Sequence, residues 1–286
     1  WSPSSVKSRG YVCTKFAEKV GPHRLVESIT TKDVRDFVRD PELAHETQRG
    51  YLRIVRAMAR WWHERGLRPP LEMPVQLKRK REPYQVIDED ELEAICAAHY
   101  TLCEERRQKK KASADPKHTG TEWMCDVWRF AFWQGLRRGA CMELRPEDIN
   151  LKYNQIQVGN RYRRAKGDKI YVAPLIPEAR EILERWMEDK RPGERVFGHA
   201  SHQYVSDDFR AAVKRAIKDG DIPPKEKLNF HSLRHSCAAR ILRETGNIYL
   251  VTQLLGHASV KITRDHYEHF IPSELQNRFE VTSANK

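Results

Sequence analysis

Hydrophobic positions in the first 68 residues recur at the three- and four-residue spacing of amphipathic helices. The clearest case lies just before Gly66, where one apolar stripe comprises Tyr51, Ile54, Val55, Met58, Trp61 and Trp62. This spacing predicts a helix with one buried face, and glycine commonly follows a helix C-terminus. A shorter helix is expected from Asp33 to Val38, with Thr30 or Thr31 as its N-cap. Residues 1–68 therefore predict an all-helical domain.

Residues 69–83 interrupt this helical pattern. Pro69, Pro70 and Pro74 are incompatible with a continuous helix. A basic run, Lys78-Arg79-Lys80-Arg81, follows them. We therefore expect an extended, basic linker between two domains.

Helical patterning resumes in residues 84–286. Asp88 is a favourable N-cap, and Glu91 three residues later completes a capping box. A polar loop is expected from Arg106 to Gly120, followed by an aromatic-rich helix over Glu122–Trp133 that ends at Gly135. Later helices are expected to begin at Pro177, to include Phe209, Val213 and Ile217, and to fill the chain after Phe230.

Two short extended runs provide the β-signal of this second domain. Gln155–Val158 alternates between polar and apolar residues, and Ile170–Leu175 is the second run. The basic segment between them reads as a turn. We therefore expect a small antiparallel hairpin or three-stranded sheet, so the fold class is mainly α with a small antiparallel β-sheet (α+β), in two domains.

Charge narrows the class of partner. The chain has 52 Lys and Arg against 40 Asp and Glu, which gives a net charge of +12. Cationic side chains that meet phosphates release condensed counterions, so this surplus favours a polyanion. Charge by itself does not separate DNA from RNA or from an acidic membrane surface.

Cysteine usage and apolar run lengths suggest the compartment. The six cysteines include no Cys-x-x-Cys pair, so we expect no zinc site, and free thiols fit a reducing environment. No apolar run approaches the ~20 residues that span a bilayer. We therefore expect an intracellular, cytoplasmic protein with no membrane partner. The start of the chain shows no signal-peptide pattern. Because the chain starts at Trp1 rather than at Met, we interpret it as a fragment or a processed form.

Six residues have side chains suited to breaking a phosphodiester without a metal. Forked guanidinium groups match phosphate oxygens, a phenol can attack phosphorus and leave again, and a lysine can protonate the departing oxygen. The candidates are Arg137, Lys166, His231, Arg234, His257 and Tyr267.

Each candidate also has a plainer interpretation. Lys166 alone would more often be an ordinary turn lysine, His231 could be a helix N-cap, and Tyr267 could be a core aromatic. His257 could interact with a helix C-terminus. Only the order and spacing of all six favours a shared site.

The candidate residues lie in five short segments: Gly135-Leu-Arg137 with Leu144 and Asp148-Ile149, Ala165-Lys-Gly-Asp-Lys169, His231-x-x-Arg234-His235, Leu255-Gly-His257 and Tyr267. These segments resemble the phage-integrase family of tyrosine recombinases. The resemblance extends over nearly the whole chain, with residues 1–68 similar to a helical core-binding domain, 69–83 to a linker and 84–286 to the catalytic domain.

The resemblance implies a role for each candidate. Arg137 and Arg234 would clamp the non-bridging oxygens, and His257 would donate to the phosphate. His231 would help to move the tyrosine proton. Lys166 would protonate the leaving 5′ oxygen. Tyr267 would form a 3′-phosphotyrosyl bond.

The resemblance also implies the partners. Family members act on double-stranded DNA, as a dimer on one site and a homo-tetramer on two paired sites, in integration and excision of mobile DNA or in resolution. They need no metal, nucleotide or other cofactor. Further DNA contacts are expected from basic residues in the helical domain, the linker and the predicted turn: Arg49, Arg53, Arg56, Arg60, Lys78, Arg79, Lys80, Arg81, Arg161, Arg163 and Arg164.

Two features depart from the family pattern. Gly139-Ala140 stand where Ser-Glu is usual, so either activity is weaker or another acid, such as Glu143, substitutes. Tyr267 comes ten positions after His257, one more than in many members, and one residue turns a helix by ~100°. The intervening turn must therefore differ.

Two other functions remain open at this stage. A recombinase-like chain that only binds DNA would share the basic charge, and residues 246–257 resemble a helix-turn-helix. A type IB topoisomerase would share the chemistry without exchanging partners. In the tail from Pro272, Leu275 and Phe279 have helical spacing. This segment packs either on its own domain or on a neighbouring subunit, and the resemblance favours the neighbouring subunit.

Overall fold

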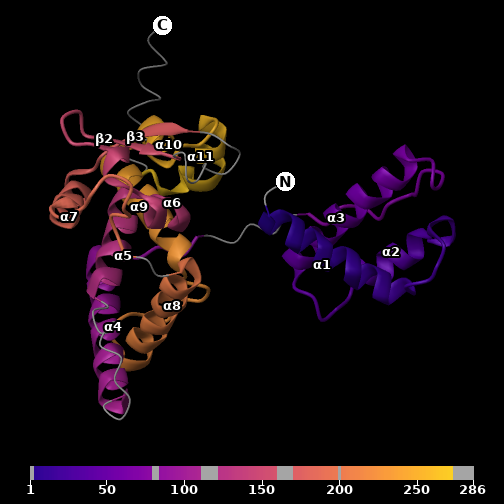
Figure 1. Cartoon of the computed structure of the whole chain (residues 1–286), viewed down its shortest axis with the longest axis horizontal. Helices are drawn as coiled ribbons and strands as arrows, with labels where there is room; N and C mark the ends of the chain where they lie inside the picture. Colours follow the sequence, from indigo (N-terminus) through magenta and orange to yellow (C-terminus); the bar gives the residue numbers. More distant parts are fainter. Residues whose placement is uncertain (1–2, 79–83, 111–121, 160–169, 199–200, 273–286) are drawn as a thin grey trace, which may run out of the picture. The chain divides into compact units, whose positions relative to one another are not determined.

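The computed structural model describes residues 3–78, 84–110, 122–159, 170–198 and 201–272. The chain divides into two compact units, Trp1–Glu82 and Pro83–Lys286, each with its own core (Figure 1). Within the described ranges, no helix is both long and apolar enough to cross a bilayer.

The first unit is helical, as the apolar spacing predicts. It contains α1 (Pro3–Val20), a short 3-10 turn, α2 (Thr31–Val38) and α3 (His45–Glu64). Thr30 is the N-cap of α2 and forms a capping box with Asp33. Phe16 of α1 packs on Phe37 of α2 at the centre of the core, with ring centroids 5.1 Å apart.

The buried face of α3 is rotated slightly from the predicted stripe. Leu52, Val55, Ala59 and Trp62 are buried. Trp61, which we expected inside, is 48% exposed. The i, i+3 and i+7 steps from Leu52 outline the face that contacts α1 and α2, so the prediction for Trp61 is wrong.

Residues 69–78 pack on this first unit. Leu71 and Met73 contact its core. On α3, Arg49 Nε donates to the Leu77 carbonyl at 2.9 Å, and Arg56 donates to the Pro74 carbonyl at 2.9 Å. The described part of the expected linker is therefore tied to α3 by two arginines.

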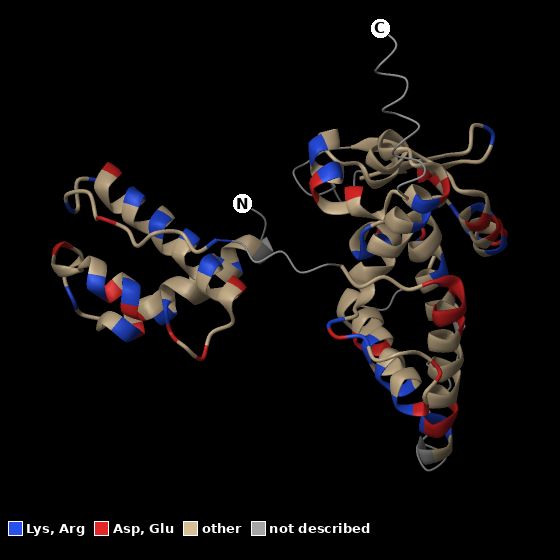
Figure 2. Cartoon of the chain, turned by 180° about the vertical axis from the view of Figure 1, so that it is seen from behind, with Lys and Arg blue, Asp and Glu red and all other residues tan. Residues whose placement is uncertain are grey.

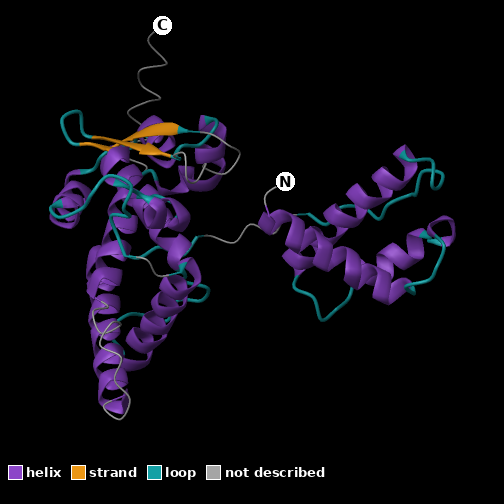
Figure 3. Ribbon diagram, in the orientation of Figure 1, coloured by secondary structure: helices purple, strands orange, loops and turns teal. Residues whose placement is uncertain are grey.

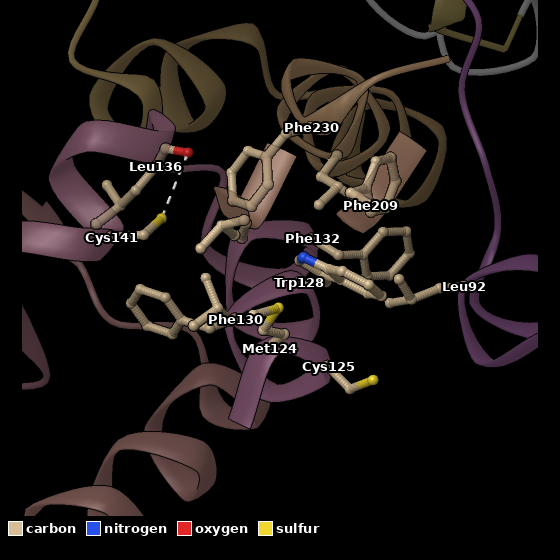
Figure 4. Packing of buried hydrophobic residues seen from close by; sticks show 14 of the residues in the cluster. Leu92, Met124, Cys125, Trp128, Phe130, Phe132, Leu136, Cys141, Phe209 and Phe230 are labelled. Carbon is tan, nitrogen blue, oxygen red and sulfur yellow. Dashed lines mark hydrogen bonds between the residues drawn. The ribbon is translucent and has the colours of Figure 1, made fainter. Parts of the chain in front are cut away.

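Two helices that contact each other lie at the centre of the helical second unit, α5 (Glu122–Gln134) and α9 (Phe230–Thr245) (Figure 3). Around them lie α4 (Glu89–Lys110), α6 (Arg138–Glu143), α7 (Pro177–Met187), α8 (His202–Asp219), α10 (Ile248–Leu255) and α11 (Val260–Tyr267). A core of large aromatic side chains, with Trp128, Phe130 and Phe132 of α5, packs against Phe209 and Phe230 (Figure 4). This core supports the turn that follows α5.

The first helix of the second unit is longer than the sequence indicated. The predicted capping box is present, since Glu91 N donates to Asp88 Oδ1 at 2.9 Å. The helix continues to Lys110, so the expected loop beginning at Arg106 is wrong. Arg106 pairs with Asp208 of α8 at 3.0 Å, and this contact between helices explains why a polar segment stays helical.

The expected small sheet is present and antiparallel. It has the order β1 (Ile149–Asn150), β2 (Gln155–Val158) and β3 (Tyr171–Pro174). Ile156 pairs with Ala173, and both are buried. The sheet lies beside α10, so it brings β3 close to the motifs at the end of the chain (Figure 1).

Candidate active site

Arg137 lies in the tight turn between α5 and α6. Gly135 has φ of 69°, and a Cβ there would be 2.8 Å from the Leu255 side chain and 2.9 Å from Cys237 Sγ. Only glycine permits both this left-handed backbone and this close approach. Arg137 is then the N-cap of α6 and is half-buried. Among the described residues, no acceptor is bound to its guanidinium.

Arg234 is the most deeply buried of the candidate cations that the structure describes. It extends from α9 and is 2% exposed. Its Nη1 donates to the Gly135 carbonyl at 2.8 Å, and its Nη2 donates to the Leu255 carbonyl at 2.7 Å. A guanidinium has five N–H donors, so these bonds fix its plane while further N–H groups remain for a ligand.

His257 belongs to an ordered chain of hydrogen bonds. Arg234 Nη2 lies 3.2 Å from His257 Nε2. Because arginine only donates, Nε2 must accept and the ring proton must be on Nδ1. Nδ1 lies 2.8 Å from the hydroxyl of the buried Thr263, which contacts the Thr252 hydroxyl at 2.7 Å. Arg234 thus sets the tautomer of His257, and Thr263 fixes the orientation of its ring.

Tyr267 is buried, with 2% of its surface exposed, at the end of α11. Its hydroxyl lies 2.7 Å from His235 Nδ1. Its ring is nearly parallel to that of His257, with centroids 6.3 Å apart. The ten-residue spacing therefore still delivers the phenol to the same cluster as His257.

The electrostatics keep the histidines neutral and the phenol protonated. Burial, together with the positive charge of Arg234, lowers the pKa of His257 to about 3. Burial and the neighbouring His231 likewise lower the pKa of His235 to about 3. Burial raises the pKa of Tyr267, although Arg234 acts in the opposite direction. The Tyr267 hydroxyl therefore donates its hydrogen to His235 Nδ1.

Gly256 allows β3 to meet the end of α10. It has φ of 62°, and a Cβ there would be 2.2 Å from the ring of Tyr171. The Tyr171 hydroxyl contacts the Leu255 carbonyl at 3.4 Å, the same carbonyl that binds Arg234. This contact joins the sheet to the Leu255-Gly-His257 motif.

The structure brings four of the six candidates together: Arg137, Arg234, His257 and Tyr267. His231 is the second residue of α9 and is exposed, with its ring centroid 4.8 Å from that of His235. It is not the N-cap, because Asn229 has that position. Lys166 lies outside the described residues.

Of the residues expected to contact DNA, some are exposed, some bind other parts of the chain, and the rest lie outside the described residues. Arg53 and Arg60 are exposed on α3, and Lys78 is exposed at the end of the first described range; basic residues recur along α3 in Figure 2. Arg49 and Arg56 bind residues 74–77, as described above. The remaining predicted contacts lie outside the described residues: Arg79, Lys80, Arg81, Arg161, Arg163 and Arg164.

Glu143 is held by other partners. Its carboxylate lies 2.7 Å from Arg195 and 3.2 Å from His202. The half-buried Ala140 stands where the family usually has a carboxylate.

Three residues around the site had no role assigned from sequence: Tyr84, His235 and Thr263. His235 is adjacent to Arg234 in the motif, which was the one available signal. Tyr84 lies at the start of the second unit, and Thr263 lies within α11. In the described ranges, no cluster of three or more His, Cys, Asp or Glu is arranged to hold a metal ion.

Comparison with known proteins decides the family. The phage integrase family profile matches residues 85–273, about two thirds of the sequence. The chain belongs to the phage integrase family. A tyrosine recombinase of Thermosipho africanus is 25% identical over 273 residues, covering 92% of this chain and 87% of its own length.

Other relatives match a shorter region. Tyrosine recombinase XerD of Lacticaseibacillus casei is 28% identical over 150 residues, covering 48% of this chain and 47% of its own length. The chain spans about half the length of most of the curated relatives that it matches. A lambda integrase dimer bound to a COC′ core site has a TM-score of 0.69 at 18% identity, covering 92% of this chain and 90% of the other. This likeness shows that the fold is shared.

Proposed function

We propose that this phage integrase family member is a site-specific DNA recombinase that cleaves and rejoins strands through a 3′-phosphotyrosyl bond. The observation that supports it most directly is the buried cluster in which Tyr267 lies beside His257 and the guanidinium of Arg234. A phenol, two arginines and a histidine donor are the groups needed for metal-free attack on phosphorus.

Each group has a task in the proposed reaction. Arg137 and Arg234 bind the non-bridging oxygens, and their charge offsets the negative charge that develops in the transition state. His257 donates to the same phosphate once Nε2 acquires a proton, which the incoming negative charge favours. Tyr267 attacks phosphorus, and Lys166 protonates the 5′ oxygen that leaves. His231 assists transfer of the phenol proton.

A nicked duplex tests the covalent step. A nick near the cleavage position lets the short downstream strand diffuse away, which traps the protein–DNA adduct on a denaturing gel. We expect an adduct for the unmodified chain and none for Tyr267→Phe, with equal DNA affinity in a gel-shift assay. Absence of the adduct on a verified binding site would instead indicate a chain that only binds DNA.

Exchange between two labelled duplexes tests recombination. A recombinase joins the strand of one duplex to the other, whereas a topoisomerase rejoins the original strand. We also propose that a dimer binds one site and a homo-tetramer holds two sites. Sedimentation with one site and with a synthetic four-way junction measures both states.

Arg234→Lys is a sharper substitution than Arg234→Ala for the phosphate clamp. Because Arg234 is buried and bound to two carbonyls, alanine would leave these acceptors without partners and lower the stability of the fold. Lysine retains the charge but loses the fork. We expect Arg234→Lys to lose adduct formation by ~100-fold while most DNA affinity remains.

The arginines of α3 offer a matched test of the DNA surface. Arg53 is exposed, whereas Arg56 of the same helix binds Pro74 and Gln76. We expect Arg53→Ala to weaken DNA binding and reduce the magnitude of its salt slope by about one. Arg56→Ala should mainly speed hydrogen exchange of residues 74–77. The reverse assignment would place the DNA on another face.

A further inference from the structure

Tyr171, the first residue of β3, places a second phenol hydroxyl beside the candidate phosphate-binding groups. This hydroxyl lies 3.4 Å from the Leu255 carbonyl oxygen, and Arg234 Nη2 donates to the same oxygen at 2.7 Å. The same Nη2 lies 3.2 Å from His257 Nε2. The Tyr171 hydroxyl therefore belongs to the cluster around Arg234, although it comes from a strand rather than from a helix.

Packing holds the ring of Tyr171 in place. A Cβ at Gly256 would lie 2.2–2.4 Å from three atoms of this ring, so the ring rests directly on the glycine backbone. On its other side along the chain, Tyr171 pairs with Val158 of β2. A donor that is already held in this way loses little conformational freedom when it binds a ligand.

The present hydrogen bond of the Tyr171 hydroxyl is weak. Its length of 3.4 Å exceeds the usual ~2.7–2.8 Å of an O–H···O bond, and its acceptor has a much shorter bond from Arg234. Directing the hydroxyl hydrogen to a better acceptor therefore costs little. A phosphate oxygen is such an acceptor, because bonds to charged oxygens are shorter and stronger than bonds to neutral ones.

The surrounding charges favour an anion at this hydroxyl. Burial raises the pKa of Tyr171, and the positive charges of Arg234 and Arg137 act in the opposite direction. The raised pKa keeps the hydroxyl protonated at neutral pH, so it is able to donate. The two guanidinium groups that act on it are the same two that the proposed reaction uses to hold the phosphate.

We propose that Tyr171 is a further catalytic residue, whose hydroxyl donates a hydrogen bond to a non-bridging oxygen of the phosphate held by Arg137 and Arg234. This role rests on the proposed function. The non-bridging oxygens gain negative charge in the transition state, so a donor directed at one of them binds the transition state more tightly than the ground state. Tyr171 keeps its proton throughout and forms no covalent bond.

Tyr171→Phe removes the hydroxyl and keeps the ring that rests on Gly256. We expect the adduct on the nicked duplex to form about 10- to 100-fold more slowly, with the thermal melting temperature retained. Tyr153→Phe is the matched control, because Tyr153 lies in the turn between β1 and β2 and is 63% exposed. The control should keep the rate of the unmodified chain. An unchanged rate in Tyr171→Phe would overturn the proposal.

Methylphosphonate substrates separate donation from a purely structural effect. Each of the two isomers replaces one non-bridging oxygen at the cleavage position by a methyl group. Tyr171→Phe should slow adduct formation on the isomer that keeps the contacted oxygen as much as on the phosphate, but by no more than about threefold on the other isomer. The ratio of rates within one protein sample cancels any loss of folded protein. Equal slowing on all three substrates would show that Tyr171 only supports the fold.

Equilibrium binding detects the same contact without cleavage. Chains carrying Tyr267→Phe, with and without Tyr171→Phe, are titrated with intact duplexes that bear one methylphosphonate at successive positions. We expect one position and one isomer at which the methyl group weakens binding about threefold to tenfold when Tyr171 is present, and much less in Tyr171→Phe. The same loss in both proteins at every position would contradict the contact. If the unmodified chain forms no adduct but this position is found, the proposed function fails while the phosphate contact of Tyr171 stands.

Discussion

The two ring nitrogens of His257 are held by different residues, Arg234 and Thr263. Arg234 donates to Nε2, and Thr263 accepts from Nδ1. Thr252 gives its own hydroxyl hydrogen to the Ile248 carbonyl, so the Thr263 hydroxyl must donate to Thr252 and accept from the histidine. A single set of donor directions therefore satisfies the whole chain of bonds.

Removing the Thr263 hydroxyl should disturb His257 while leaving the shape of the core unchanged. Thr263→Val has a similar volume but leaves Nδ1–H without an acceptor. We expect adduct formation on the nicked duplex to fall about tenfold, with DNA affinity retained. Thr263→Ser restores the hydroxyl and should recover most of the rate. Equal loss in the serine and valine variants would contradict the role of the hydroxyl.

The buried histidines also predict how stability depends on pH. Burial lowers the pKa values of His235 and His257 to about 3 in the folded chain, from the ordinary histidine value of 6.5. Between pH 6.5 and pH 3 the unfolded chain binds protons that the folded chain does not, so the free energy of unfolding falls as the pH falls.

This dependence is measurable by urea unfolding at pH 7 and at pH 5. After allowance for partial solvent screening, His235 should account for a loss of about 1 kcal/mol over this interval. His235→Asn should lose less stability on acidification than the unmodified chain by about that amount. An identical decline in both proteins would show that His235 is readily protonated when folded.

At the scale of elements, local signals predicted the helices and strands well where capping residues and periodicity coincide. The structure confirms the helix caps at Thr30 and Asp88, the pairing of β2 with β3, and the helix that begins at Pro177. The loop expected at Arg106 was wrong because α8 contributes Asp208, a contact between distant segments. Periodicity along one segment contains no information about what packs against it.

Glycines at helix ends provide a matched prediction at this scale. Gly256 and Gly220 both follow a helix in the left-handed region, with φ of 62° and 86°. Only Gly256 faces another side chain, since nothing lies within 4 Å of a Cβ at Gly220. We expect Gly220→Ala to cost about 1 kcal/mol and Gly256→Ala about 2–4 kcal/mol.

Urea unfolding of both alanine variants measures this difference. Adding Tyr171→Ala to Gly256→Ala removes the clashing ring and should recover part of the additional loss. Equal destabilisation at the two glycines would indicate that backbone strain alone decides the cost, and that the approach of β3 to α10 contributes nothing.

For the whole molecule, the candidate site belongs to one of the two units. Arg137, Arg234, His257 and Tyr267 all lie within 83–286, as do Tyr84 and His235. The first unit has a separate core with its own aromatic pairs. The chemistry of the site and the basic surface of α3 therefore belong to separately packed bodies.

Residues 83–286 produced alone should consequently fold and retain the chemistry. We expect a cooperative thermal transition, adduct formation on a saturating nicked duplex, and DNA affinity at least tenfold lower because phosphate contacts have been removed. Circular dichroism and gel-shift assays measure these outcomes. Loss of cooperative unfolding would show that the first unit is required for the second to fold.

The sequence by itself singled out the candidate reactive groups, because motif spacing and side-chain chemistry are local properties that can be read along the chain. It also determined most element types and the two-part organisation. Only the tertiary structure decided that Arg234 is held by the Gly135 and Leu255 carbonyls, that Thr263 orients His257 and that Tyr84 packs beside Tyr267. These relations depend on burial and close approach between distant segments, and such contacts arise only when the chain packs.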